Sequence, residues 1–255
     1  TEWFPVSHDM IEVVDHALQV SQMTDGALDI TVGPLVNLWG FGPDQHPDRV
    51  PTAEQIASEM ARVGYQYVHV REEPPALKKD REDIYLDLSA LAKGYAVDRV
   101  ADYLESLGIT DYMVEVGGEL RLKGQNERGT PWRIAVERPS PGIRDIFSVM
   151  QLDDMGVATS GDYRNYFEED GQRYSHTIDP LTGKPIDHRL ASVTVIAESS
   201  MHADALATAL MVAGPEKGGR LAEQHGMAVY FIIKSADGFD ADATEPFMQY
   251  LVSSD

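Results

Sequence analysis

A carboxylate and an ammonium group lie close together in the segment from Ile84 to Asp98, which reads IYLDLSALAKGYAVD. The short apolar run before Asp87 predicts a strand, and the helix formers after Ser89 predict a helix that carries Lys93 in its first turns. A corner of this kind brings both side chains near the unpaired backbone N–H groups of the helix start, where phosphates and cations bind. The alternative is a capped helix whose charged side chains are simply solvated.

A histidine before a rigid turn is the second candidate for chemistry. His176 ends a short strand-like run, and the turn sequence DPLTGKP over residues 179–185 follows it. An imidazole with an unperturbed pKa of about 6.5 can take a proton from a hydroxyl nucleophile within hydrogen-bond reach. The alternative is a surface or structural histidine.

The third candidate is a pair of oxygen ligands, Asp204 and Thr208, in a segment with helical character. Residues spaced by four share one helix face, so the carboxylate and the hydroxyl could meet at one cation. Such ligands suit Mg²⁺, which takes its remaining oxygens from water and from substrate phosphates. An exposed polar stripe or a capping interaction is the alternative. His202 beside them could suggest a transition metal, but one imidazole is insufficient.

The composition is that of an acidic globular protein without cysteine. Its 255 residues include 42 acidic and 21 basic side chains, which give a formal net charge of -21. This charge repels nucleic acid and anionic lipid, so neither is expected as a partner, and a phosphorylated ligand needs a local cation. The lack of cysteine excludes thiolate catalysis and zinc–thiolate sites. No apolar run approaches the roughly 20 residues of a membrane span.

The elements that must position these residues indicate an α+β fold with mixed, largely antiparallel sheets flanked by helices. Gly117 and Gly118 predict a tight hairpin, or a backbone that approaches a ligand closely. The Gly- and Pro-containing stretch from Asp29 to Leu38 is expected to be a loop. The periodicity predicts helices over residues 10–20, 53–63, 89–107, 200–212 and 215–225, and strands over 67–71, 112–116, 119–123, 132–137, 146–152, 191–197 and 227–233.

Six ordered motifs together resemble the ApbE family of FAD:protein FMN transferases. They are TDGALDITVGPLVNLWGFG, DLSALAKGYAVD, VEVGGELRLKG, ATSGDYRNYF, SHTIDPLTGKPI and SVTVIAESSMHADALATALMV. The match runs almost from end to end, and motifs this long are far more specific than a lone glycine pattern. The resemblance implies an enzyme with an ApbE-like fold that uses Mg²⁺ to cleave FAD, releases AMP and joins FMN to a threonine or serine of an acceptor protein by a phosphoester bond.

The resemblance also implies a role for each matching residue. His176 would be the catalytic base. Lys93 stands where relatives carry either Lys or Glu. FAD contacts are expected from Ala27, Leu28, Asp29, Asp87, Lys93 and Ile178, and metal ligands from Ala90, Asp204, Ala207 and Thr208, with the alanines acting through their backbone.

Partners and location are expected from kinship alone. Acceptors in the family are subunits of membrane redox complexes, of the Na⁺-pumping NADH:quinone reductase or Rnf type, and members are periplasmic lipoproteins anchored to the inner membrane. The chain is expected to form a single flavin transferase domain over residues 1–255. Thr1 is preceded by neither an export signal nor the first strand segment of the family, so the N-terminus is expected to be truncated.

Two other functions share these residues. A metal-dependent FAD pyrophosphatase would use the same ligands but release free FMN and AMP. A non-catalytic flavin-binding protein would need neither a positioned His176 nor the metal pair of Asp204 and Thr208. Analysis of the products distinguishes all three.

Overall fold

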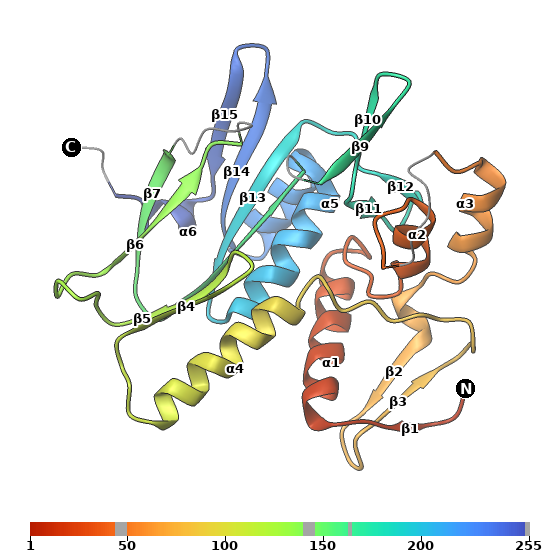
Figure 1. Cartoon of the computed structure of the whole chain (residues 1–255), viewed down its shortest axis with the longest axis horizontal. Coiled ribbons are helices and arrows are strands. Elements are labelled where there is room, and N and C mark those ends of the chain that lie inside the picture. The colour runs from red at the N-terminus through yellow and green to blue at the C-terminus, as the bar shows by residue number, and fades with distance from the viewer. Residues whose placement is uncertain (44–49, 140–145, 163–164, 253–255) are drawn as a thin grey trace. The chain divides into compact units, whose positions relative to one another are not determined.

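The computed structural model describes residues 1–43, 50–139, 146–162 and 165–252. Contacts between residues divide the chain into two compact units (Figure 1). Unit 1 comprises residues 1–90 and 164–187, and unit 2 comprises residues 91–163 and 188–255. Within the described residues, no helix combines the length and the apolar character that crossing a bilayer requires.

A six-stranded antiparallel sheet is the centre of unit 2, and its strand order is β15-β14-β13-β8-β5-β4. The strands are β4 (Tyr112–Val116), β5 (Glu119–Lys123), β8 (Met155–Gly161), β13 (Leu190–Ala197), β14 (Ala228–Ser235) and β15 (Gly238–Ala243). The first seven residues of β13 are buried, as expected for a central strand covered on both faces.

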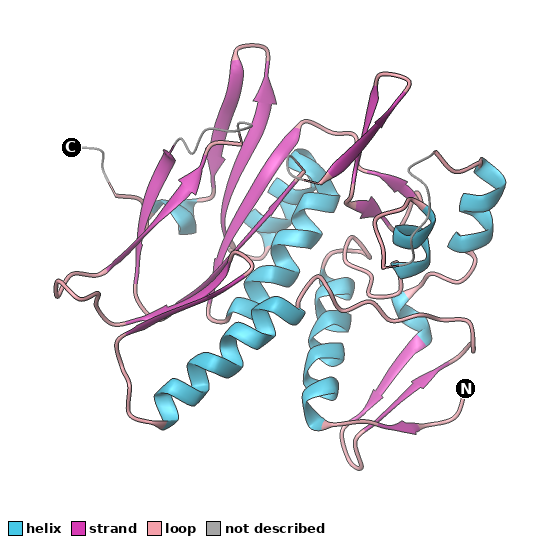
Figure 2. Ribbon diagram, in the orientation of Figure 1, coloured by secondary structure: helices cyan, strands magenta, loops and turns pink. Residues whose placement is uncertain are grey.

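Two helices, α4 (Ala92–Ser106) and α5 (Ser200–Gln224), pack against each other and against this sheet (Figure 2). Gly214 interrupts α5 with a non-helical backbone, so its two halves correspond to the two helices predicted there. On the sheet, Phe231 contacts α5 at Gly218. Its neighbours Tyr230 and Ile232 point to the opposite face, because side chains alternate along a strand.

The opposite face of the sheet is covered by a hairpin and a short helix. The hairpin consists of β6 (Trp132–Glu137) and β7 (Ile146–Leu152), and the helix is α6 (Glu245–Met248). Phe247 of α6 is fully buried and packs with Tyr230, Ile232 and residues of both hairpin strands in one apolar cluster. Unit 2 therefore has a helix layer on one face of its sheet and an apolar hairpin layer on the other.

Unit 1 is built from shorter elements. Ser7 caps α1 and Thr52 forms a capping box at α3, so both helices begin where the chain supplies a side-chain acceptor. The helices are α1 (His8–Met23), α2 (Gly33–Leu38), α3 (Ala53–Met60) and the 3₁₀ turn η1 (Tyr65–Tyr67). The strands are β1 (Phe4–Pro5), β2 (Val68–Arg71) and β3 (Ala76–Lys79) in one sheet, and the pairs β9 (Tyr166–Glu169) with β10 (Gln172–Ser175) and β11 (Ile178–Asp179) with β12 (Lys184–Pro185).

The predicted α+β fold with largely antiparallel sheets is confirmed, and the strands predicted over 112–116, 119–123, 132–137 and 146–152 have the predicted bounds. Three local predictions are wrong. The segment from Ile84 to Leu88 belongs to no strand, and α4 begins at Ala92 rather than after Ser89, because residues 89–91 form a turn. The loop predicted over residues 29–38 contains α2, which Pro34 helps to begin. That residues 1–255 act as a single domain stays a prediction.

Candidate functional site

Two of the charged residues predicted for the site, Lys93 and Asp204, lie together in unit 2. The Lys93 ammonium lies 3.2 Å from both carboxylate oxygens of Asp204. It also lies 3.3 Å from Oε1 of Glu119, a residue that the sequence interpretation did not single out. The Asp204 and Glu119 side chains are only 4% and 5% exposed, whereas that of Lys93 is 43% exposed. We refer to these three residues as the carboxylate–lysine cluster.

The cluster is positioned where α4 and α5 cap each other. The Gly94 N–H in the first turn of α4 donates to Asp204 of α5 over 3.1 Å. Asp98 of α4 in return accepts from the N–H groups of Ser200 and Met201, at 2.9 and 2.8 Å. Each helix thus supplies a carboxylate to the N-terminus of the other, where unpaired N–H groups and the helix dipole favour negative charge.

Glycine at position 94 allows this close approach of the helices. A Cβ atom there would lie 2.4 Å from the backbone oxygen of Ser200. Such a close contact to backbone cannot be relieved by a rotamer change, so any side chain at 94 would push α4 and α5 apart. The AKG sequence within DLSALAKGYAVD therefore combines a charged residue with the glycine that brings it to its partner.

The electrostatics of the cluster favour an added cation. Burial raises the pKa of Asp204, and the Lys93 ammonium only partly opposes that rise. Burial also raises the pKa of Glu119, and the nearby charge of Asp204 raises it further. Two buried carboxylates share one ammonium, so a second positive charge would stabilise their ionised forms.

Thr208 lies one turn after Asp204 on α5, as the spacing predicts, and its hydroxyl is 3.4 Å from that of Ser160 on β8. Asp204 is buried, so the pair is not an exposed polar stripe. Ala207 is completely buried, and its methyl group offers no ligand, so any contact with a metal must come through its carbonyl. A carboxylate and a hydroxyl are hard oxygen donors of the kind that Mg²⁺ takes.

The described residues contain no group of three or more His, Cys, Asp or Glu side chains that could hold a metal ion. A site with one carboxylate and one hydroxyl fits a cation that keeps most of its coordination sphere for water, backbone carbonyls and phosphate oxygens, as Mg²⁺ does. It does not fit a transition metal that requires several imidazoles. Ala90, the backbone ligand predicted in addition, is the last residue of the first segment of unit 1.

In unit 1, Asp29 shapes the loop that contains Ala27 and Leu28. Its Oδ1 accepts from the Thr31 N–H and hydroxyl at 2.8 and 2.6 Å, and its Oδ2 accepts from the Tyr65 N–H at 2.9 Å. Burial raises the pKa of Asp29, and these hydrogen bonds oppose the rise. All three predicted FAD contacts in this loop are buried, with exposed fractions of 3 to 7%.

Asp87 lies beside this loop. Its N–H donates to the Ile30 carbonyl over 2.7 Å, which joins the 84–88 segment to the Asp29 loop. Its carboxylate accepts from the Ser89 N–H at 2.9 Å and so closes the turn before α4. The unit thus brings together four of the residues predicted to contact FAD: Ala27, Leu28, Asp29 and Asp87.

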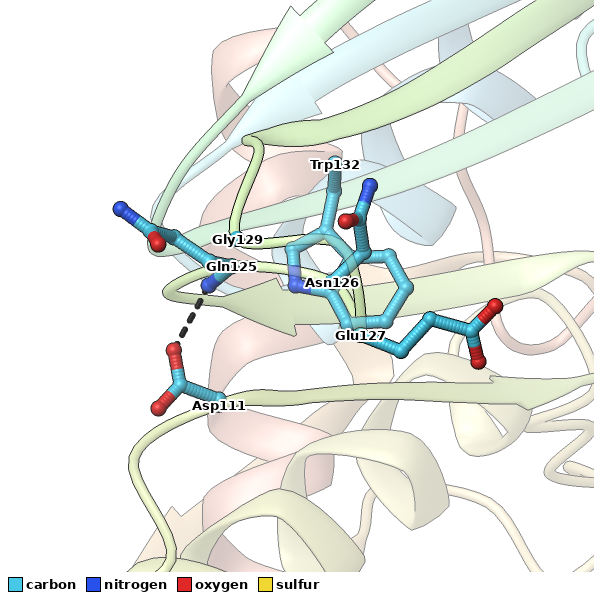
Figure 3. Close-up of a pocket in the computed structure, with 6 residues that line it drawn as sticks. All are labelled: Asp111, Gln125, Asn126, Glu127, Gly129 and Trp132. Atoms are coloured by element: carbon cyan, nitrogen blue, oxygen red, sulfur yellow. Dashed lines mark hydrogen bonds between the residues drawn. The ribbon is translucent and has the colours of Figure 1, made fainter.

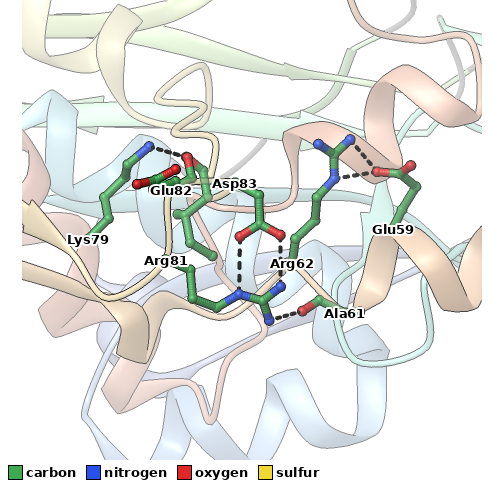
Figure 4. A network of polar contacts seen from close by, with 8 residues as sticks. Glu59, Ala61, Arg62, Lys79, Arg81, Glu82 and Asp83 are labelled. Atoms are coloured by element: carbon green, nitrogen blue, oxygen red, sulfur yellow. Dashed lines mark hydrogen bonds and ion pairs between the residues drawn. The ribbon is translucent and has the colours of Figure 1, made fainter. Parts of the chain in front are cut away.

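A network of charged side chains anchors the chain that leads to Asp87 (Figure 4). Lys79 donates to the carbonyls of Glu82 and Ile84, at 3.1 and 2.7 Å. The Arg81 guanidinium bonds both Asp83 and the Ala61 carbonyl at the end of α3. These contacts hold the segment in place although no strand pairing does.

His176 follows β10 directly, as predicted, and its ring is fixed by its surroundings. Its Nδ1 lies 3.0 Å from the Asn165 carbonyl, and the His176 N–H donates to the same oxygen over 3.2 Å. A carbonyl can only accept, so Nδ1 carries the proton and Nε2 of the neutral ring keeps its lone pair. The Phe41 ring meets the imidazole edge-to-face at a centroid distance of 6.3 Å.

The turn after His176 is held by aromatic packing. Trp39 donates from Nε1 to the Gly183 carbonyl over 2.9 Å, and its ring lies 5.6 Å from that of Tyr174. Ile178 in β11 is 5% exposed and packs in the same apolar cluster as Trp39 and Phe167. Trp39, which is buried, therefore supports the turn after His176.

The described residues also form a pocket that contains none of the predicted site residues. This open depression of about 560 Å³ in unit 2 is lined by the turn after β5 and by Trp132 (Figure 3). Asp111 accepts there from the Gln125 N–H over 2.7 Å. None of the residues predicted for catalysis, FAD or metal lines this depression, so it is separate from the predicted site residues.

Sequence reasoning missed Glu119. The Gly117-Gly118 pair predicts either a tight hairpin or a backbone close to a ligand, and it forms the hairpin turn, since both residues have positive φ between β4 and β5. The available signal was an acidic residue directly after such a turn, at the first position of a partly buried strand. Its pairing with Lys93 depends on the packing of α4 on the sheet, which no local pattern encodes.

The relatives of this chain show that it is an enzyme of the transferase class. A model of the ApbE family matches residues 1–231. The chain is 52% identical over 251 residues to the FAD:protein FMN transferase of Vibrio cholerae, covering 98% of this chain and 75% of that protein. It is 47% identical over 252 residues to the same enzyme of Escherichia coli, covering 98% and 72%.

Solved structures give the same result. The structure of the flavin transferase ApbE from Vibrio cholerae matches with a TM-score of 0.90 at 50% identity, over 98% of this chain and 79% of that one. The apo form of the flavinyl transferase ApbE from Pseudomonas stutzeri matches with a TM-score of 0.90 at 46% identity, over 99% and 78%. The chain belongs to the ApbE family.

Proposed function

We propose that this protein transfers FMN from FAD to a threonine or serine side chain of an acceptor protein, with Mg²⁺, and releases AMP. The observation that carries the proposal is the buried Asp204, held by Lys93 and one turn from Thr208, in a chain whose relatives are named FAD:protein FMN transferases. A protein with a net charge of -21 needs local positive charge to bind a pyrophosphate, and this cluster is where it can recruit such charge.

Asp204, Thr208 and the Ala207 carbonyl would hold the metal in unit 2, and the Ala90 carbonyl is the further ligand that the family resemblance implies. When bound, Mg²⁺ neutralises the phosphate oxygens of FAD and stabilises the charge that develops on them. Lys93 would add a point charge toward the same phosphates. The FAD contacts proposed in unit 1 remain Ala27, Leu28, Asp29, Asp87 and Ile178.

His176 would act as the general base. In the tautomer required by the Asn165 carbonyl, Nε2 can accept the proton of an acceptor hydroxyl. The hydroxyl oxygen then forms a bond to the phosphorus of the FMN half, and the bridging P–O bond breaks with its electron pair leaving on AMP. Because the Asn165 carbonyl fixes the ring, Nε2 would face one direction, and an acceptor hydroxyl positioned there would react in preference to water.

We extend the proposal to the acceptor and to location on the strength of the family resemblance. The acceptor would be a subunit of a membrane redox complex of the Na⁺-pumping NADH:quinone reductase or Rnf type, and the protein would be located in the periplasm as a lipoprotein. A labelled acceptor isolated from membranes of the source cells would test the first part. Fractionation of those cells would test the second.

The experiment that tests the proposed function is an analysis of both products. The protein is incubated with FAD, Mg²⁺ and a threonine-containing acceptor fragment, and the acceptor is examined by in-gel flavin fluorescence and by mass spectrometry. A mass increase equal to one FMN on a threonine, with one AMP released for each label, is expected. Release of free FMN and AMP without labelling would contradict transfer and support a pyrophosphatase, and bound but intact FAD would support a binding protein.

A further inference from the structure

Glu119 is a buried acidic residue to which the proposed chemistry assigns no role. Its side chain is buried at the start of β5, its Oε1 is 3.3 Å from the Lys93 ammonium, and its Oε2 is buried without a hydrogen-bond partner among the described residues. A buried carboxylate oxygen in this state is costly and calls for an explanation. Asp204 shares the same ammonium at 3.2 Å, so Lys93 has two alternative carboxylate partners.

We propose that Glu119 is a positioning residue that holds the Lys93 ammonium when a divalent cation takes the carboxylate of Asp204. The inference rests on the metal site of the proposed function. Without metal, Lys93 neutralises Asp204 and Glu119 together. With metal, it keeps its ion pair with Glu119 alone, so it remains in the site without competing for Asp204.

The surroundings make Glu119 the fixed partner and Lys93 the movable one. Glu119 lies on a strand whose next residue, Leu120, is paired with both β4 and β8, whereas the ammonium is at the end of a flexible and partly exposed stem. Gly117, with a φ of 67°, brings the hairpin against this stem: a Cβ there would lie 3.2 Å from Cδ of Lys93 and 3.3 Å from Oε2 of Glu119. The hairpin thus keeps the ammonium beside Glu119.

The charges predict how variants should bind metal. In Glu119→Gln, the ammonium keeps only Asp204 as a charged partner and competes with the cation, so Mg²⁺ affinity should fall about tenfold. In Lys93→Met the competitor is gone, and Mg²⁺ affinity should rise by a similar factor. In the double variant, Glu119 no longer has an ammonium to hold, so its affinity should equal that of Lys93→Met.

Isothermal titration with Mg²⁺ alone on the purified chain tests the proposal. Glu105→Gln is the matched control, because it removes the same charge from a carboxylate that pairs with Lys123 in the same unit, and wild-type affinity is expected. Circular dichroism melts confirm that each variant is folded. Should Glu119→Gln not fold alone, Glu119→Asp replaces it, because it keeps the charge but shortens the reach to the Lys93 ammonium; a weaker Mg²⁺ affinity is expected, and wild-type affinity would count against the proposal.

Three results would overturn the inference, and they differ in whether the proposed metal site also falls. Wild-type affinity in Glu119→Gln, with binding lost in Asp204→Ala, would refute the role of Glu119 and leave the proposed metal site intact. A weaker affinity in the double variant than in Lys93→Met would show that Glu119 acts on the cation directly, by its charge or as a ligand, and not through Lys93. No Mg²⁺ binding by the wild type would remove both the inference and the metal from the proposed function.

Discussion

The two units hold their chemical groups in different ways. In unit 2, Lys93, Glu119 and Asp204 project from helices and a central strand, and contacts between segments distant in the sequence hold them together. In unit 1, Asp87 and His176 lie on turns and are fixed by backbone partners. The regular elements of unit 2 fix the two carboxylates on either side of a more mobile ammonium, whereas the turns of unit 1 direct single groups.

The difference also appears in the cost of burial. The cluster in unit 2 contains two carboxylates whose pKa values burial raises, with one ammonium to compensate them. The buried Asp29 of unit 1 is compensated locally by three hydrogen bonds, two of them from its own loop. In the proposed function, unit 2 therefore supplies the carboxylate for an added cation, and unit 1 supplies the histidine that would take the proton.

The largest expected effect is a loss of FMN transfer when His176 of unit 1 is replaced. Replacing the base in His176→Ala should lower the transfer rate by about 10²- to 10⁴-fold, while FAD binding, followed by fluorescence quenching, stays near the wild-type level. His69→Ala, which removes a histidine paired with Asp80 in the same unit, is the control and should transfer normally. Equal losses of binding and transfer would assign His176 to binding.

The next effect is on the packing of unit 2. Gly94→Ala places a methyl group 2.4 Å from the Ser200 oxygen and should lower the free energy of unfolding by about 2 kcal/mol, measured by denaturant titration. Gly219→Ala in α5 meets no atom within 4 Å and should be neutral or slightly stabilising. Similar stabilities for the two variants would show that α4 and α5 need not approach so closely.

A smaller effect is expected from the reciprocal caps. Asp98→Ala leaves the Ser200 and Met201 N–H groups without their acceptor and should cost about 1 to 2 kcal/mol of stability. Asp102→Ala removes only an exposed ion pair on the same helix and should cost less than about 0.5 kcal/mol. An equal cost for both would mean that Asp98 does not cap α5.

The smallest effect concerns pH. Burial raises the pKa values of Asp29, Asp98, Glu119 and Asp204, so the folded protein binds more protons than the unfolded chain above the ordinary values of 3.8 for Asp and 4.5 for Glu. The free energy of unfolding should therefore fall as pH rises through the raised values. Amide hydrogen exchange in the absence of metal should show the decline mainly in unit 2, which holds three of the four groups. A fall in stability confined to unit 1 would show that burial of carboxylates costs more in unit 1 than in unit 2.

The sequence predicted the fold best where periodicity dominates. The hairpin of β4 and β5, the strands β6 and β7 and the two halves of α5 follow from alternation and helical spacing within each segment. Predictions were wrong over residues 29–38 and 84–91, where hydrogen bonds from distant residues, such as that between Asp87 and Ile30, decide the conformation. Family resemblance selected the site residues, but the ion pairs of Lys93 arise from tertiary packing, and Glu119 was missed for that reason.

In the proposed function, Asp204 binds the metal and His176 accepts the proton of the acceptor hydroxyl. The most direct test is the rate of FMN transfer as a function of Mg²⁺ concentration for the two alanine variants. We predict that Asp204→Ala raises the half-saturating Mg²⁺ concentration, whereas His176→Ala lowers the maximal rate and leaves that concentration unchanged. An unchanged Mg²⁺ requirement in Asp204→Ala, or a shifted one in His176→Ala, would contradict the account.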